Sequence, residues 1–172
     1  MDETYVEGIK AGRSRRHMGS KALVAIAAQV DGKGIGRICL RRIPPASPSP
    51  LVAFVKYAVE PGSVVITDGW KTYARLKQEG FKHQPRLINA SGNTTSALLP
   101  RVHRVSSLLK RWLMGAHNGA LSREQLDSCL DDFTFRFNRR TSRYRWKLFC
   151  KLVAQTVAIE PIPYTRLTAA TS

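Results

Sequence analysis

The chain has 172 residues, 43% of them hydrophobic, which suits the core of one domain. Its 28 Lys and Arg residues against 12 Asp and Glu give a formal net charge of +16, which favours a nucleic-acid partner. No apolar run approaches the roughly 18–20 residues of a membrane span, and Cys39, Cys129 and Cys150 lack disulfide-framework or CxxC zinc spacing, so we expect a protein of the reducing cytoplasm.

Strands are predicted at the start of the chain. Residues 1–6 form a short predicted strand, and a basic loop follows over residues 10–21. Two apolar runs, residues 22–30 and 35–43, flank a DGKG turn. This pattern predicts a β-hairpin.

Short elements alternate after the hairpin. Ser49 as N-cap and Pro50 as first helical residue predict a helix over residues 51–58. Three further elements are predicted next: a buried strand at 64–67, a short helix at 71–80 and a fifth strand at 85–89. A strand–helix–strand crossover after a hairpin indicates an α/β fold whose mixed sheet is covered by helices.

The second half of the chain is predicted to be helical, over residues 98–117, from residue 122 onward, and over residues 144–158. Each helix carries an apolar stripe expected to face the core. The stripes consist of Leu98, Val102, Val105, Leu109 and Leu113 in the first, Leu126, Leu130, Phe133 and Phe137 in the second, and Trp146, Phe149, Val153 and Val157 in the third. Residues 160–172 are expected to form a poorly ordered tail.

Two aspartates mark the candidate site. Asp2 lies on the first predicted strand, and Asp68 directly follows the fourth, at the edge where α/β sheets place ligands. If these strands are neighbours, the carboxylates converge and need a cation such as Mg²⁺ or Mn²⁺ between them. The alternative for Asp68 is an ordinary Asp-Gly turn.

The helix over residues 98–117 adds His103 and Lys110 on one flank, seven residues and nearly two turns apart. His103 stands about 100° from the apolar stripe, at the edge of a cleft above the sheet. An imidazole there can complete a metal site, and Lys110 can hold a phosphate. The alternative is a surface histidine and a solvated lysine.

Four segments together resemble a bacterial insertion-sequence transposase family of the DDE superfamily. They are DETYV (2–6), VVITDGW (64–70), SLLKRWLMGAH (107–117) and the aromatic-basic LDDFTFRFNRR (130–140). Their order and separations also fit the family, so the resemblance covers nearly the whole chain.

The resemblance implies a ribonuclease H-like catalytic domain over residues 1–159. It implies that Asp2 and Asp68 are catalytic metal ligands, that His103 takes the third position, which is usually Glu, and that Lys110 lies near the DNA backbone. Two divalent ions, Mg²⁺ or Mn²⁺, would activate water to hydrolyse a phosphodiester at the transposon end. The freed 3′-OH would then attack target DNA within a homo-oligomeric synaptic complex.

Two features depart from the family pattern. The family carries a zinc ribbon and DNA-binding region before this domain, whereas Asp2 here follows Met1 directly, so we expect a fragment with a truncated first strand. Near the third position the family has an Asn and then an aromatic pair, where this chain has Pro100, Val105 and Ser106. Pro100 fits only in the first turn of its helix.

Basic side chains are the candidates for DNA-backbone contacts. They are Lys10, Arg13, Arg15, Arg16, Lys21, Lys110, Arg136, Arg139 and Arg140. A solvated charge run is the alternative for these residues. Two alternative functions also stay open: a non-catalytic DNA-binding remnant of a transposase, and an RNA- or ribosome-associated basic protein.

Overall fold

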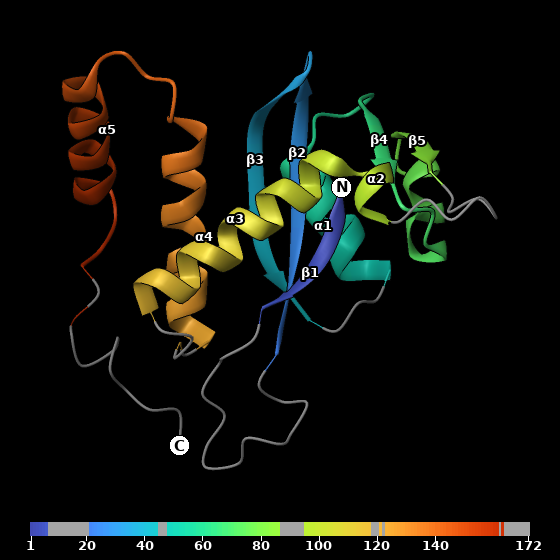
Figure 1. Ribbon diagram of the computed structural model, residues 1–172, viewed down its shortest axis with the longest axis horizontal. Coiled ribbons are helices and arrows are strands. Elements are labelled where there is room, and N and C mark those ends of the chain that lie inside the picture. The colour runs from blue at the N-terminus through green and yellow to red at the C-terminus, as the bar shows by residue number, and fades with distance from the viewer. Residues whose placement is uncertain are drawn as a thin grey trace, which may run out of the picture.

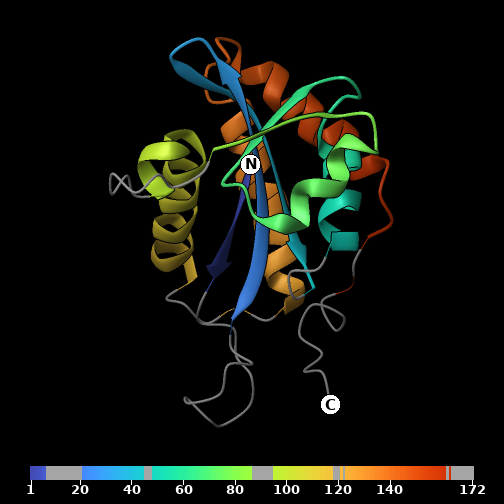
Figure 2. The ribbon, with the colours of Figure 1, turned by 90° about the vertical axis from the view of Figure 1, so that its right-hand side faces the viewer.

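The computed structural model describes residues 1–6, 21–44, 48–86, 95–117, 121, 123–161 and 163. Within them, strands form a central layer with helices on both sides (Figures 1 and 2). The predicted strand residues 87–89, the helix start at Ser122 and most of the expected tail lie outside the described residues.

The strands form two small sheets. In the first, β1 (Asp2–Val6), β2 (Ala22–Asp31) and β3 (Gly34–Ile43) are antiparallel in the order β1-β2-β3. In the second, β4 (Val64–Thr67) and β5 (Lys82–Pro85) are parallel. The predicted hairpin, the first strand and the strand over residues 64–67 are confirmed.

A hydrogen bond from the N-terminal ammonium group links the two sheets. The Met1 nitrogen donates to the carbonyl oxygen of Ile66 at 2.6 Å, which makes β1 and β4 neighbours. Figure 1 shows the strands side by side as β3, β2, β1, β4 and β5. The first and fourth strands therefore lie next to each other, as convergence of the aspartates requires.

Helices cover both faces of the strands. The elements are α1 (Pro48–Ala58), the 3₁₀ helix η2 (Lys71–Lys77), α2 (Thr95–Leu98), α3 (Pro100–His117), α4 (Arg123–Asn138) and α5 (Arg145–Val157). α3 and α4 share one core with the sheet, whereas α1 and η2 share another on the opposite face. In Figure 2, α3 and α1 lie on opposite sides of the strands.

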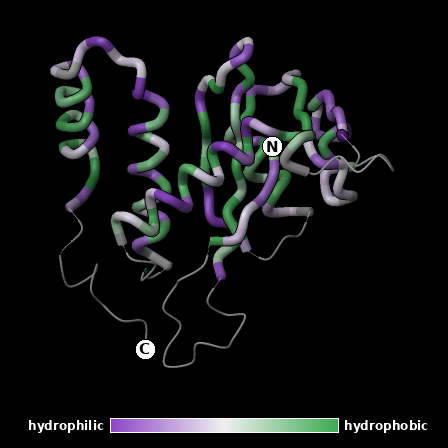
Figure 3. Tube along the Cα trace, viewed as in Figure 1, coloured by the Kyte–Doolittle hydropathy of each residue, from purple (hydrophilic) through white to green (hydrophobic). Residues whose placement is uncertain are grey.

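β2 supplies both cores because its side chains alternate across the sheet. Val24 and Ile26 enter the core with α3 and α4, and Leu23 and Ala25 enter the core with α1. This explains the nearly continuous apolar run of β2, which is green in Figure 3. Four of the five predicted stripe residues, Val102, Val105, Leu109 and Leu113, are buried in α3. The fifth, Leu98, is half-buried and ends α2.

The C-terminal end of α4 covers the outer edge of β3. The Asn138 side chain accepts a hydrogen bond from Ile38 N at 2.7 Å and donates one to Ile38 O at 2.8 Å. Arg140 donates to the carbonyl oxygens of Ile35 and Gly36. Unpaired backbone groups at the edge of a sheet can pair with another chain and lead to aggregation. Here the side chains of Asn138 and Arg140 bind backbone groups of β3 in place of a further strand.

Three predicted boundaries are wrong. The helix predicted over residues 98–117 begins at Pro100, after a separate helix that ends at Leu98. α1 begins at Pro48, so Ser49 lies inside the helix and is not its N-cap. β5 covers residues 82–85, whereas the prediction was 85–89. The prediction rested on local β propensity, but pairing with β4 determines which residues form the strand. In contrast, Pro100 is the first residue of α3, as its chemistry requires.

The expected inward face of α5 is also wrong. Trp146, Phe149, Val153 and Val157 are exposed, and neither core includes a residue of α5. The helical periodicity was correct, but α5 does not pack that face against the described sheet. Among the described residues, no helix is both long and apolar enough to cross a membrane.

Candidate metal centre

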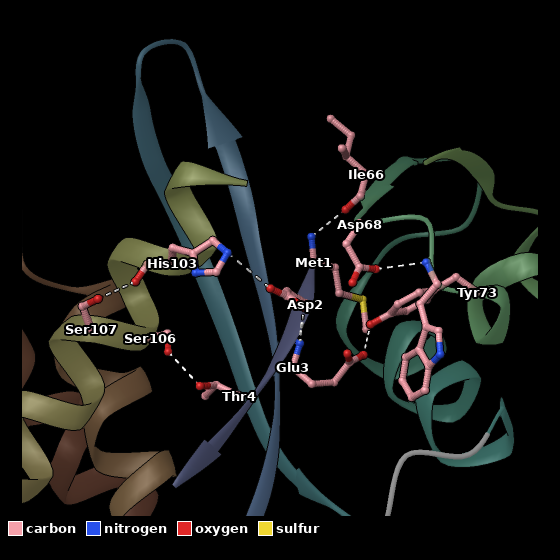
Figure 4. Close-up of polar contacts among 11 residues, drawn as sticks. Met1, Asp2, Glu3, Thr4, Ile66, Asp68, Tyr73, His103, Ser106 and Ser107 are labelled. Atoms are coloured by element: carbon pink, nitrogen blue, oxygen red, sulfur yellow. Dashed lines mark hydrogen bonds and ion pairs between the residues drawn. The ribbon is translucent and has the colours of Figure 1, made fainter. Parts of the chain in front are cut away.

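Asp2 is the first residue of β1 and is half-buried. It pairs with Ile26 of β2, whose side chain enters the core beneath α3. Strand alternation therefore directs Asp2 and Thr4 toward α3, and Glu3 toward the opposite face. Figure 4 shows this divergence: Asp2 points to His103, and Glu3 points to Tyr73.

His103 lies on the first turns of α3 and faces Asp2. Its Nε2 is 3.6 Å from Asp2 Oδ2, with side-chain exposures of 35% and 13% for the two residues. That nitrogen is buried and has no hydrogen-bond partner among the described residues. One turn along, Ser106 Oγ donates to Thr4 Oγ1 at 3.0 Å and fixes α3 against β1.

Asp68 follows β4 in a turn held by local hydrogen bonds. Its Oδ1 accepts a hydrogen bond from Trp70 N at 3.1 Å, and Gly69 has a φ of 86°. The buried Thr67 hydroxyl accepts from Gly69 N at 3.2 Å and lies 2.9 Å from His83 Nε2. The Asp-Gly turn is therefore present, and it presents the Asp68 carboxylate beside β1 (Figure 4).

The acidic side chains around β1 influence one another. Burial and the charge of Asp68 raise the pKa of Asp2, against the opposing effects of the Glu3 backbone N–H and of His103. Burial, then Asp2 and Asp68, raises the pKa of Glu3 to about 8. Burial is the main cause of both pKa shifts, and the neighbouring carboxylates add to it.

The sequence interpretation missed Glu3 and Tyr73. Tyr73 is buried on η2, and its hydroxyl donates to Glu3 Oε1. Alternation along β1 predicts only that Glu3 faces away from Asp2. The sequence gives no signal that a tyrosine 70 residues later meets it.

Lys110 lies farther from the carboxylates. It is exposed on α3, seven residues and about 10 Å along the helix axis from His103. The structure thus brings Asp2 and His103 together, with Asp68 near enough to Asp2 to raise its pKa, and it places Lys110 on the same helix as His103.

The predicted DNA-backbone residues are dispersed. Lys10, Arg13, Arg15 and Arg16 lie outside the described residues, and Lys21 is exposed before β2. Arg136 forms an ion pair with Asp132, Arg139 stacks on Phe135, and Arg140 binds the β2–β3 hairpin.

A groove of about 1120 Å³ concentrates other positive charge. It reaches Met1 and Ile66, which adjoin Asp2 and precede Asp68. We call it the basic groove, because its lining includes one acidic residue, Glu60, and six basic ones. The basic residues are Arg37, Arg86, Arg101, Arg139, Lys147 and Lys151. The sequence analysis singled out only Arg139 of these, because the others are scattered along the chain.

The geometry around Asp2 brings two possible metal ligands near each other. Among the described residues, no group of three or more His, Cys, Asp or Glu side chains is placed so that it could hold a metal ion. However, the unpartnered His103 nitrogen faces a carboxylate at 3.6 Å, longer than a hydrogen bond. Two ligands of one ion lie about 3.0–3.4 Å apart, so Asp2 and His103 stand close to the separation of two ligands of one ion.

Comparison with known proteins identifies the chain. Neither the curated proteins nor the solved structures that were compared with it gave a match. The family described as ISXO2-like transposase domain matches residues 1–138, from β1 to the end of α4. This match covers most of the chain and both candidate aspartates, and the chain therefore belongs to the ISXO2-like family of DDE transposase domains.

Proposed function

We propose that this chain is a ribonuclease H-like catalytic domain that cleaves and joins DNA with divalent metal ions. Family membership and the five-strand order, with helices on both faces, support this proposal. The observation that carries it is the meeting of the Asp2 carboxylate with the otherwise unpartnered His103 nitrogen, beside Asp68.

In this proposal Asp2 and Asp68 hold the metal through carboxylate oxygens, and His103 is the third donor. Bound divalent ions would neutralise the carboxylates and activate water for phosphodiester hydrolysis. The hydrogen bond between Ser106 and Thr4 holds α3 against β1 beside this donor set. Because one donor is an imidazole, we expect Mn²⁺ to support more activity than Mg²⁺.

DNA binding is assigned to a different set of residues. The basic groove adjoins Asp2 and carries six cationic side chains against one acid. If these six contact phosphates, affinity should fall about 10³-fold between 50 and 200 mM salt. Lys110 would contact the backbone on the other side of the carboxylates, along α3.

The test is nicking of a labelled DNA duplex that carries the element's end, with Mn²⁺ and with Mg²⁺. Asp68→Asn and His103→Ala should remove nicking and leave salt-sensitive DNA binding nearly unchanged, because backbone binding depends on Lys and Arg. Asp31→Asn, at the exposed end of β2, is the matched control and should cut normally.

Other outcomes separate the alternatives. DNA binding without cleavage in either metal would identify a non-catalytic remnant. Cleavage that persists in Asp68→Asn would exclude the proposed site. Preference for RNA, without metal dependence or any need for Asp2 and Asp68, would instead favour an RNA-associated protein.

A further inference from the structure

Asp2 and Asp68 lie on segments that no β-ladder joins. β1 pairs with β2, and β4 pairs with β5 in a separate sheet, so strand pairing does not fix one aspartate relative to the other. The hydrogen bond from the Met1 nitrogen to Ile66 O joins the two segments just before the aspartates. One such bond alone would let the segments pivot about it, so a second contact beyond the aspartates would fix the two carboxylates relative to each other.

Glu3 and Tyr73 provide such a second contact. Tyr73 lies on η2, shortly after Asp68, and its hydroxyl donates to Glu3 Oε1. The Tyr73 side chain is 1% exposed and belongs to the core that α1 and η2 share. A hydroxyl at that depth destabilises the fold unless it has a partner, so the packing of this core favours the arrangement in which η2 meets Glu3. Figure 4 shows the two side chains meeting on the side of β1 that faces away from His103.

These contacts form a continuous series of hydrogen bonds from one aspartate to the other. Asp2 Oδ1 accepts a hydrogen bond from Glu3 N at 2.9 Å, and the Glu3 carboxylate accepts one from the Tyr73 hydroxyl. Tyr73 N donates to Trp70 O at 3.0 Å, and Trp70 N donates to Asp68 Oδ1 at 3.1 Å. The Glu3–Tyr73 bond is the link in this series that connects the two segments.

We propose that Tyr73 is a positioning residue for the carboxylates of Asp2 and Asp68. Its hydrogen bond to Glu3 holds the Asp68 turn (residues 68–70) against β1 and thereby sets how far apart the two carboxylates lie. Glu3 transmits this effect and faces away from Asp2, so we assign it no metal. The effect on the turn follows from these contacts, whereas the effect on metal binding rests on the proposed function.

Amide hydrogen exchange of the metal-free chain, resolved by NMR, tests the effect on the turn. Tyr73→Phe keeps the ring in the core and removes the hydroxyl. The Trp70 amide should then exchange about tenfold faster, as expected when a local structure loses one hydrogen bond. Glu3→Gln keeps an acceptor oxygen for Tyr73, so in this variant the Trp70 amide should exchange at the wild-type rate.

Asn138→Ala is the control for a general loss of stability. It loses two hydrogen bonds at β3, the opposite edge of the row of strands, and it should leave the exchange of the Trp70 amide unchanged. Tyr57→Phe is the chemical control, because it removes a phenol hydroxyl from a side chain that is 67% exposed on α1. It should also leave the Trp70 amide unchanged.

Titration of the same proteins with Mn²⁺ tests the consequence for the carboxylates. Tyr73→Phe should bind Mn²⁺ about tenfold more weakly than the wild type, as is usual when the support of a metal ligand is lost. Asn138→Ala and Tyr57→Phe should bind it with wild-type affinity. If the wild type binds no Mn²⁺, the proposed function fails, and the exchange rates alone decide whether Tyr73 holds the turn.

Three results would overturn the proposal. The first is an unchanged exchange rate of the Trp70 amide in Tyr73→Phe, or equal acceleration by Asn138→Ala, which would show a general loss of stability. The second is acceleration by Glu3→Gln as large as that by Tyr73→Phe, because the charge of Glu3 and not this hydrogen bond would then hold the turn. The third is wild-type Mn²⁺ affinity in Tyr73→Phe when the wild type binds the ion.

Discussion

Thr67 is expected to hold the Asp68 turn in place, and replacing it by Val tests this directly. Its side chain is fully buried, accepts a hydrogen bond from Gly69 N, and lies 2.9 Å from His83 Nε2. Val keeps the shape of Thr and removes the hydroxyl, so it leaves both partners unpaired. An unpaired buried polar group costs about 1–3 kcal/mol.

We therefore expect Thr67→Val to lower the free energy of unfolding by about 2 kcal/mol. In a chain of this size such a loss lowers Tm by roughly 4–8 °C. Thr67→Ser is the matched variant, because it keeps the hydroxyl and loses one methyl group, at a cost of about 1 kcal/mol. Urea unfolding of the three proteins measures both differences.

Metal binding separates a positioning role from a purely structural one. If the hydroxyl orients the turn, Thr67→Val should weaken Mn²⁺ binding in the folded protein, whereas Thr67→Ser should bind as the wild type does. Equal Mn²⁺ affinity of the two variants, or greater stability of Thr67→Val than of Thr67→Ser, would refute the reasoning.

Three further predictions concern stability. Asn138→Ala loses two hydrogen bonds to Ile38 and should cost about 2 kcal/mol in urea unfolding, with faster hydrogen exchange at the Ile38 amide; unchanged exchange would contradict this. Burial, then a nearby lysine, lowers the pKa of His83. The unfolded chain therefore binds more protons, stability should fall as pH drops below about 6.5, and His83→Gln should fall less steeply; parallel pH profiles would exclude this cause. Asp127→Asn breaks the partly exposed ion pair with Arg42 and should cost at most about 1 kcal/mol, so a larger loss in thermal unfolding would show a greater role for this pair.

Local sequence patterns predicted the elements whose packing follows from their own periodicity. The apolar runs of β2 and β3 flank a two-residue turn, so the hairpin needs no distant information. The stripe of α3 also follows from spacing alone, and Pro100 sets where that helix begins.

The predictions that failed concern elements whose position or packing depends on segments distant in the sequence. β5 is selected by its pairing with β4, although the residues it uses, KHQP, have little β propensity. In α5 the periodicity predicted an amphipathic helix, but spacing cannot tell whether the apolar face packs within its own chain or outside it.

The candidate site shows the same division. Asp2 and Asp68 were predicted from strand ends and from the resemblance, and the Met1–Ile66 bond makes their strands neighbours. Glu3 and its tyrosine partner were not predicted, because their contact depends on how η2 packs beneath β1.

Mn²⁺ binding to the folded chain, measured by calorimetric titration without DNA, tests the central claim most directly. The wild type and Asp31→Asn should bind Mn²⁺ with the same affinity, whereas Asp2→Asn, Asp68→Asn and His103→Ala should each bind it at least about tenfold more weakly. Wild-type affinity in all three of these variants would show that the groups gathered around β1 are not a metal centre.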